Sequence, residues 1–186
     1  MILGILSVQG AFAEQETMFR KAGAETFEIR QLADLERPMD ALVLPGGEST
    51  VQGKLLHELG LFAPLKAKIL EGLPVFATCA GLILLAEKLA DDPTVWFGVL
   101  PVTVRRNTYG RQLGSFACRG SVGPDEDVPQ TFIRAPGLEA VGPDVTVLST
   151  ANGHPTGVRY RNITAFAWHP ELTDDLRVVR RFLASI

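Results

Sequence analysis

The first half of the chain alternates short apolar runs with longer segments of helical periodicity, and this alternation constrains the fold more than any other feature. The apolar runs are rich in branched residues and are expected to be strands: Ile2–Val8, Thr26–Ile29, Ala41–Leu44 and Pro74–Thr78. The segments that follow them are expected to be helices: Ala13–Ala22, Ser49–Leu59, Phe62–Leu70 and Gly81–Leu89. This order predicts a mostly parallel sheet with helices on both faces.

The second half changes character, because its short apolar runs are separated by glycine, proline and asparagine. Six runs are expected to be strands, either antiparallel or inserted at a sheet edge: Phe97–Arg105, Ser115–Val122, Thr131–Ala135, Val145–Ser149, Gly157–Tyr160 and Thr164–Trp168. The polar stretch Gly123–Pro129 is expected to be a loop, and Leu172–Ser185 a final helix. Ser49 and Gln52 have the spacing of a capping box at a helix start. We therefore expect one α/β domain over residues 1–186.

Composition excludes several functional classes. The 186 residues carry a net charge of −3, which gives no electrostatic signature for nucleic acid or an anionic membrane. The three histidines lack metal-ligand spacing, and no apolar run approaches the about 20 residues of a bilayer span. The N-terminal MILGILSVQG has no basic region and no cleavage site of a signal peptide. These features predict a cytoplasmic protein with reduced thiols and no metal.

Cys79 has the most informative surroundings in the chain. It lies between an apolar strand and an apolar helix, and its neighbours Ala77, Ala80 and Gly81 are small. A sharp strand-to-helix turn that presents a nucleophile needs small neighbours, because bulky side chains would collide across it. The amide groups and dipole of the following helix would favour the thiolate. A structural cysteine in a buried strand fits the same local pattern.

A cysteine nucleophile needs an oriented base, and His169 and Glu171 can supply both groups. They follow the apolar strand that ends at Trp168. In an extended chain residues i and i+2 point to the same side, so Glu171 can fix the tautomer of His169. Cysteine, histidine and carboxylate form the arrangement that acyl transfer requires. Each residue alone also fits a simpler role, His169 as a surface histidine and Glu171 as a carboxylate at a helix start.

The segment Leu44–Thr50 (LPGGEST) is the third candidate element. Gly46 and Gly47 follow a strand, where two glycines allow a tight turn with outward N–H groups, as an oxyanion hole requires. The spacing excludes a phosphate-binding loop. Such a loop would need glycine at position 48 and Ser or Thr at position 55, where the chain has Glu48 and Leu55. A turn that only starts a helix remains the simpler alternative.

Arginines near these segments are candidate ligands for a substrate carboxylate. Arg105, Arg106 and Arg111 form a small basic group, and Arg134 lies in a separate strand-like run. A solvated loop is the usual explanation for arginines in such positions. The other cysteine and histidines are expected to take no part in chemistry: Cys118, His57 and His154.

Three motifs, at 45–50, 78–86 and 169–173, resemble class I glutamine amidotransferases. With three more, the set of six in this order and spacing resembles the glutaminase subunits of pyridoxal 5′-phosphate synthase. The six are VQG at 8–10, PGGEST at 45–50, TCAGLILLA at 78–86, RNTYGRQ at 106–112, FIRAP at 132–136 and HPELT at 169–173. The resemblance covers the chain from residue 2 to the last helix. It implies a flavodoxin-like fold, a three-layer sandwich with a mixed, mostly parallel central sheet. Trp168 departs from the pattern, which usually has phenylalanine before the histidine.

The resemblance also implies a reaction, hydrolysis of L-glutamine to L-glutamate and ammonia without a cofactor. Cys79 would attack the side-chain amide, His169 would transfer protons, and Glu171 would orient His169. Backbone N–H groups of Gly47 and Ala80 would meet the oxyanion. The family pattern places substrate binding at six residues: Gly47, Glu48, Ser49, Arg106, Ile133 and Arg134. Glu48 suits the substrate ammonium and an arginine its carboxylate, although sequence does not identify which arginine.

The same resemblance implies a partner, a barrel-shaped synthase subunit that receives the ammonia in an assembly of twelve synthase and twelve glutaminase chains. The segments Gln9–Gly10 and Pro45–Gly47 would lie at or near that contact. A cysteine hydrolase of the related peptidase and deglycase superfamily is a second interpretation. It is disfavoured because Ala80 stands where those proteins usually have histidine. A non-catalytic scaffold is a third, and the intact Cys79, His169 and Glu171 count against it.

Overall fold

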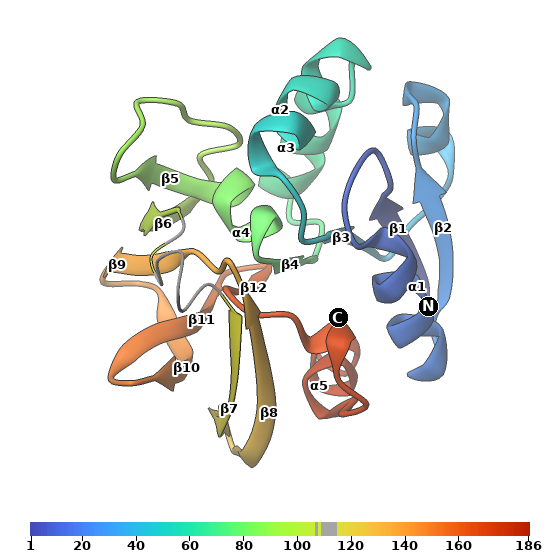
Figure 1. Ribbon diagram of the computed structural model, residues 1–186. Helices are drawn as coiled ribbons and strands as arrows, with labels where there is room; N and C mark the ends of the chain where they lie inside the picture. The colour runs from blue at the N-terminus through green and yellow to red at the C-terminus, as the bar shows by residue number, and fades with distance from the viewer. Residues whose placement is uncertain (107, 109–114) are drawn as a thin grey trace.

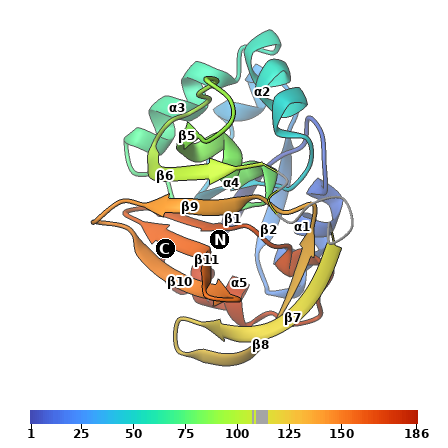
Figure 2. The same cartoon turned by 60° about the vertical axis from the view of Figure 1, so that its left-hand side comes forward.

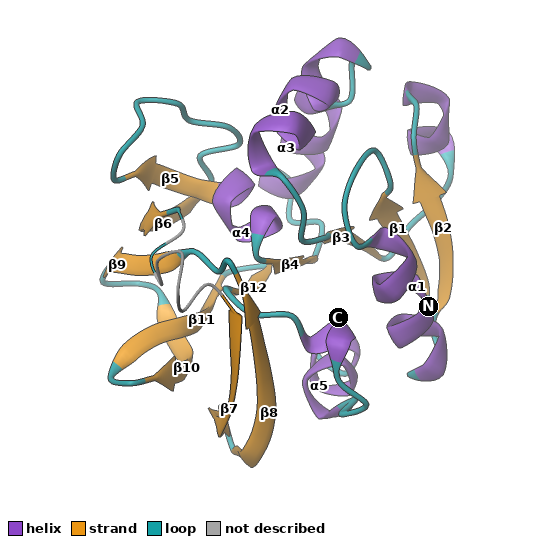
Figure 3. Ribbon diagram, viewed as in Figure 1, coloured by secondary structure: helices purple, strands orange, loops and turns teal. Residues whose placement is uncertain are grey.

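The computed structural model describes residues 1–106, 108 and 115–186, and Figure 3 shows its helices and strands. The α-helices are α1 (Phe12–Lys21), α2 (Ser49–Glu58), α3 (Phe62–Leu70), α4 (Ala80–Leu85) and α5 (Arg177–Leu183). Two short 3-10 helices are η1 (Leu32–Glu36) and η2 (Pro170–Leu172). The strands of the first half are β1 (Ile2–Leu6), β2 (Glu25–Ile29), β3 (Ala41–Leu44), β4 (Val75–Thr78) and β5 (Ala86–Leu89). Those of the second half are β6 (Leu100–Arg105), β7 (Ser115–Val122), β8 (Asp125–Ile133), β9 (Gly137–Val141), β10 (Thr146–Ala151), β11 (His154–Tyr160) and β12 (Ile163–Phe166).

The strands form a large mixed sheet and a small one. The large sheet has the order β2-β1-β3-β4-β12-β11-β10-β7-β8 (Figure 1). Its first five strands are parallel neighbours, and the remaining pairings are antiparallel. The small sheet, β5-β6-β9, lies between α3 and the β10–β11 hairpin (Figure 2). The mixed sheet was expected, but parallel pairings do not predominate, because the antiparallel extension contributes as many pairings as the parallel part.

Two hydrophobic clusters explain why the central strands lack polar alternation. One contains buried residues of α2, α3 and α4, and the other contains those of α1 and α5. Figure 1 shows these two sets of helices on opposite sides of the large sheet. All four residues of β3 and all four of β4 are buried. A strand covered on both faces reads as a continuous apolar run, which is why these elements were easy to predict.

Three sequence-based expectations about helices and strands are wrong. The helix expected over Gly81–Leu89 ends at Leu85, because Ala86–Leu89 pairs with β6 as a parallel strand. Most of the loop expected over Gly123–Pro129 belongs to β8. Its acidic residues bind arginines at the exposed end of a hairpin, so their polarity reflects exposure rather than a loop. The last helix begins at Arg177 rather than at Leu172, after the turn η2.

The expected capping box at Ser49 and Gln52 is also absent. The residue before α2 is Glu48, which makes no side-chain capping bond. The Gln52 side chain is buried and donates instead to the carbonyl oxygens of Gln9 and Pro45, at 3.0 and 3.2 Å. Tertiary contacts of the buried amide therefore replace the local bond that the spacing predicted.

Gly81 lies where α4 packs closely against β3 of the large sheet. A methyl group there would overlap the backbone carbonyl of Leu44, which cannot move without distorting β3. We expect Gly81→Ala to lower the free energy of unfolding by about 3 kcal/mol in urea denaturation, the upper range for overpacking. The control Gly60→Ala has open space and only a positive φ of 69°, so its expected loss is about 1 kcal/mol. Equal losses in the two variants would contradict close packing at Gly81.

Candidate active site

Four segments from the carboxyl ends of neighbouring parallel strands meet around one pocket. They follow β1, β3, β4 and β12, the place where ligands bind in open α/β sheets. The pocket has a volume of about 460 Å³. Its walls are formed by Gln9, Ala11, Gly46, Gly47, Glu48, Ser49, Thr50, Cys79, Ile83, Arg106, Ile133, Arg134, His169 and Leu172.

Cys79 occupies a strained turn between β4 and α4. Its φ of 47° and ψ of −100° lie where residues with a side chain are rare, so the surrounding structure must hold it there. One such restraint is the Cys79 N–H, which donates to the Phe166 carbonyl on β12 at 2.8 Å. The side chain is largely buried and lines the pocket. The turn expected from the small neighbours is therefore present.

His169 and Glu171 form a buried pair beside Cys79. The distance from His169 Nδ1 to Glu171 Oε1 is 2.7 Å, and both residues are buried. The His169 N–H donates to the Thr131 carbonyl at 2.8 Å, so strand β8 holds the backbone of this segment. The surface-histidine interpretation of His169 is therefore wrong. Glu171 points to the histidine from η2 rather than serving the start of a long helix.

The electrostatics of the pair favour a protonated imidazole. Burial lowers the pKa of His169, but hydrogen bonds with Cys79 and Glu171, together with the negative charge of both groups, raise it to about 10. An imidazolium next to sulfur is a proton donor for a leaving group that departs from an adduct on the cysteine. The arrangement can therefore support nucleophilic attack by sulfur and protonation by nitrogen.

Gly46 lies in the loop after β3, next to the side chains of His169 and Cys79. A Cβ atom at this position would overlap the His169 ring and lie 3.4 Å from Cys79 Cβ. Only glycine therefore lets the backbone approach both residues. The next glycine, Gly47, lies against the side chain of Gln9, whose Oε1 accepts the N–H of Glu48 at 2.9 Å.

Charged side chains line the mouth of the pocket. Glu48 and Arg134 form an ion pair of 2.7 Å, and both side chains are more than half exposed. Arg106 donates to Thr50 Oγ1 at 3.0 Å and pairs with Asp92. The pocket therefore offers one carboxylate and two guanidinium groups to a zwitterionic ligand.

Most of the predicted site residues line this single pocket. They are Cys79, His169, Gly47, Glu48, Ser49, Arg106, Ile133 and Arg134. Glu171 is reached through His169. Ala80 is fully buried and is not part of the wall, but it is the first residue of α4, so its N–H has no partner within the helix.

Other predictions fall away from the pocket. Arg105 pairs with Asp91 and Glu139 rather than lining it. Arg111, with most of the RNTYGRQ motif, lies outside the described residues. Cys118 is half-buried on β7, where burial raises the pKa of its thiol. The side chains of His57 and His154 are exposed, as expected.

Sequence reasoning missed several polar residues that support the site. Gln15 and Gln52 are fully buried on helices next to the loop after β3, and Asp92 binds Arg106. The sequence pattern could have indicated the two glutamines, because each lies at a helix position where the periodicity predicts a buried apolar residue. Asp92 had no such signal, since only the tertiary fold brings it to Arg106.

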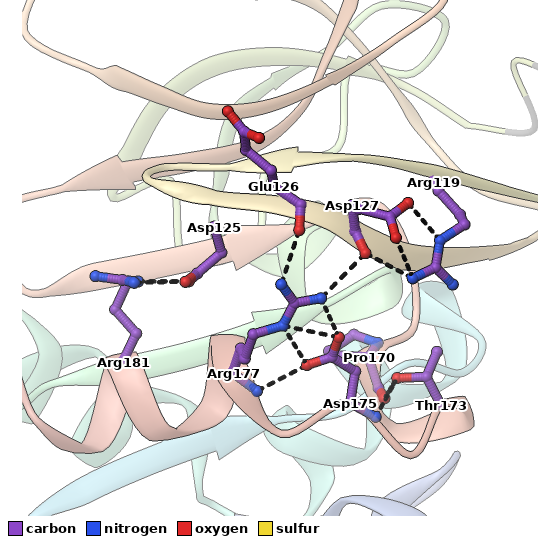
Figure 4. A network of polar contacts seen from close by, with 9 residues as sticks. All are labelled: Arg119, Asp125, Glu126, Asp127, Pro170, Thr173, Asp175, Arg177 and Arg181. Carbon is purple, nitrogen blue, oxygen red and sulfur yellow. Dashed lines mark hydrogen bonds and ion pairs between the residues drawn. The ribbon is translucent and has the colours of Figure 1, made fainter.

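A polar network fastens the segment after His169 to the β7–β8 hairpin (Figure 4). The Arg177 guanidinium donates to the carbonyl oxygens of Glu126 and Asp127 and to the Asp175 carboxylate. On the hairpin, Arg119 binds the Asp127 carboxylate. The residues are mostly exposed, so each ion pair contributes little to stability by itself.

Two kinds of feature are absent from the part of the chain that the structure describes. Across residues 1–106, 108 and 115–186, no group of three or more histidine, cysteine or acidic side chains could hold a metal ion. In the same part of the chain, no helix combines the length and the apolar character needed to span a bilayer.

The raised pKa of His169 predicts a pH dependence of stability. Because the folded-state pKa lies above the usual 6.5, the stabilising contribution is complete below about pH 6.5 and is lost as the pH rises towards 10. We expect the free energy of unfolding of the wild type to fall over this range more steeply than that of His169→Gln, by on the order of a few kcal/mol. Urea denaturation at several pH values measures both slopes. If the free energy of unfolding changed with pH equally in the wild type and in His169→Gln, the raised pKa of His169 would be contradicted.

Comparisons with known proteins agree with this geometry. The model of the SNO glutamine amidotransferase family matches residues 5–186. A pyridoxal 5′-phosphate synthase subunit PdxT from Desulfitobacterium hafniense is 54% identical over 186 residues, covering 100% of this chain and 94% of the relative. The PdxT of Bifidobacterium longum is 51% identical and covers 97% of this chain and 98% of its own length.

Solved structures include a similar glutamine amidotransferase and a more distant chain that shares the fold. A crystal structure of a glutamine amidotransferase superposes with a TM-score of 0.94 at 39% identity, covering 99% of this chain and 98% of that one. The structure of PurLQS from Thermotoga maritima, at 15% identity and a TM-score of 0.65, shares the fold alone. The match across nearly the whole chain, with the α/β fold and its mixed sheet, shows that this protein belongs to the SNO glutamine amidotransferase family.

Proposed function

We propose that this glutamine amidotransferase cleaves the side-chain amide of glutamine through Cys79, His169 and Glu171, and that the ammonia is used in the synthesis of pyridoxal 5′-phosphate. The observation that carries the proposal is the buried series of side chains from Glu171 through His169 to Cys79, which ends at the pocket. The relatives that match the full chain are named as subunits of pyridoxal 5′-phosphate synthase, which supports the use of the ammonia.

The reaction begins with attack of the Cys79 sulfur, as its thiolate, on the amide carbon. The carbonyl oxygen becomes an oxyanion, and the N–H groups of Gly47 and Ala80 are the proposed donors. Protonated His169 then gives its proton to the amide nitrogen, and ammonia leaves a thioester on Cys79. Neutral His169 next removes a proton from water, which attacks the thioester and releases glutamate. Glu171 holds the ring of His169 throughout.

The charged side chains at the mouth of the pocket form a rim that suits the ammonium and carboxylate groups at the other end of the substrate. Glu48 is proposed to bind the ammonium group, and Arg134 or Arg106 the carboxylate. Ser49 and Ile133 complete the proposed binding site. Glu48 and Arg134 neutralise each other in this structure, so an amino acid zwitterion can take over both of their charges without leaving either unpaired.

The proposed partner is a barrel-shaped synthase subunit, in an assembly of twelve chains of each kind that acts in the cytoplasm. The contact is proposed to include Gln9–Gly10 and Pro45–Gly47, which adjoin the pocket at the Gly47 side. A partner there would lie next to the oxyanion donors, so binding could change the rate of hydrolysis.

Removal of the nucleophile tests the catalytic role. We expect Cys79→Ala to lose at least about 10³-fold of the ammonia release from glutamine, because the remaining groups cannot form the thioester. Release is measured for the chain alone and with its synthase subunit. The matched control Cys118→Ala removes the other thiol, which is half-buried on β7, and is expected to stay within about twofold. An active Cys79→Ala, or an inactive folded wild type with and without the partner, would contradict the proposal.

Removal of a rim charge tests substrate binding. We expect Arg134→Ala to raise the KM for glutamine roughly 10-fold with a smaller change in kcat, because a charged hydrogen bond to the substrate is lost. Arg30→Ala serves as control, since it removes an exposed arginine that pairs with Glu28 outside the pocket. An unchanged KM in Arg134→Ala would remove this residue from the binding site.

A further inference from the structure

A fully buried amide on α1 points towards the loop that carries the proposed oxyanion donor. Gln15 lies on the same buried face as Met18 and Phe19, and no part of it is exposed. A buried amide is costly unless it is hydrogen-bonded. Its Nε2 donates to the hydroxyl oxygen of Thr78 at 2.9 Å, while its Oε1 is buried without a partner among the described residues. The glutamine therefore keeps a polar contact where an apolar side chain would pack without cost.

The Thr78 hydroxyl joins three segments of the chain. Thr78 is fully buried at the end of β4, immediately before Cys79. Besides the contact with Gln15, its oxygen accepts the N–H of Gly46 at 3.0 Å. The hydroxyl is thus the connection between α1, the strand that carries the nucleophile, and the loop after β3.

The other side of Gly46 is also held from the start of α1. Its carbonyl oxygen accepts the N–H of Ala11, the residue before the helix, at 2.9 Å. A peptide unit is planar with its C=O and N–H pointing in opposite directions, so a fixed Gly46 carbonyl also fixes the N–H of Gly47. Contacts at Ala11 and Thr78 therefore determine the orientation of the backbone on both sides of Gly46.

We propose that Gln15 and Thr78 are positioning residues: they hold the Pro45–Gly46 peptide, and so place the adjoining Gly46–Gly47 peptide where the Gly47 N–H can stabilise the oxyanion. The inference rests on the proposed glutaminase function. Neither residue lines the pocket, so both act through the loop rather than on the substrate. Loss of the hydroxyl leaves two buried donors, Gly46 N–H and Gln15 Nε2, without their acceptor. The loop then shifts or turns to satisfy them.

Substitutions at Thr78 separate positioning from folding. We expect Thr78→Val, which keeps the shape and removes the hydroxyl, to lower kcat for ammonia release roughly 10- to 100-fold while KM changes less than about threefold. Thr78→Ser restores the hydroxyl and is expected to recover most of the rate. Gln15→Met removes only one of the two contacts, so its expected loss of kcat is smaller. The matched control Thr156→Val makes the same change at another fully buried threonine and is expected to keep kcat within about twofold.

Alkylation by iodoacetamide measures the reactivity of Cys79 in a reaction that forms no oxyanion and so does not need the oxyanion donors. The thiolate displaces iodide at the CH₂ carbon, a C–S bond forms as the C–I bond breaks, and no carbonyl oxygen gains charge. We expect Thr78→Val to be alkylated at Cys79 within about twofold of the wild-type rate although hydrolysis is slow. Modification is followed by mass spectrometry on folded protein.

The outcomes distinguish this inference from the proposed function. Unchanged kcat in Thr78→Val with an active wild type would overturn the positioning role alone. Equal losses of alkylation and hydrolysis would also overturn it, because the damage would then lie at Cys79 or His169. If Thr78→Val fails to fold, Thr78→Ser and Gln15→Met still decide: a low kcat in Thr78→Ser, or full activity in Gln15→Met, contradicts the inference. A wild type that releases no ammonia but is alkylated at Cys79 would instead overturn the proposed function.

Discussion

The parallel pairing of β4 with β12 is the constraint on which the site depends. It sets Thr78 opposite Phe166 in the register, and the Cys79 N–H continues the ladder by donating to the Phe166 carbonyl. Two segments ninety positions apart in the sequence therefore end at the same edge of the sheet, one with the cysteine and the other with His169. Any other register of this pairing would move Cys79 away from His169, so the observed register keeps the candidate residues together.

Burial and neighbouring charges have opposite effects on the pKa of His169, and the effect of the charges is the larger. An isolated histidine at this depth would lose its proton, yet the contacts with Glu171 and Cys79 retain it. His169 and Glu171 are both buried, and burial strengthens the interaction between their charges. The missing side chain of Gly46 provides the space that the His169 ring occupies.

The sequence predicted the parallel half of the fold well because fully buried strands and the helices between them have strong periodic signals. It predicted the antiparallel half less well, since β8 begins with three acidic residues and β9 lies in a run with no clear alternation. The candidate site residues could be selected from the sequence because Cys79, His169 and the two glycines occupy positions that few residue types can fill. The supporting residues could not, because Asp92 and Thr78 act through contacts that only the tertiary structure creates.

The difference in burial between the two charge pairs of the site matches their different proposed roles. The pair of His169 with Glu171 is buried, so removing one partner would leave a charge without solvent, and the pair persists as a fixed unit. The pair of Glu48 with Arg134 is mostly exposed, where such contacts contribute only about 0–1 kcal/mol. A substrate zwitterion can therefore separate this second pair at little cost and gain two charged contacts in return. In this structure the charges of Glu48 and Arg134 balance each other, and both side chains remain exposed to a ligand that carries both charges.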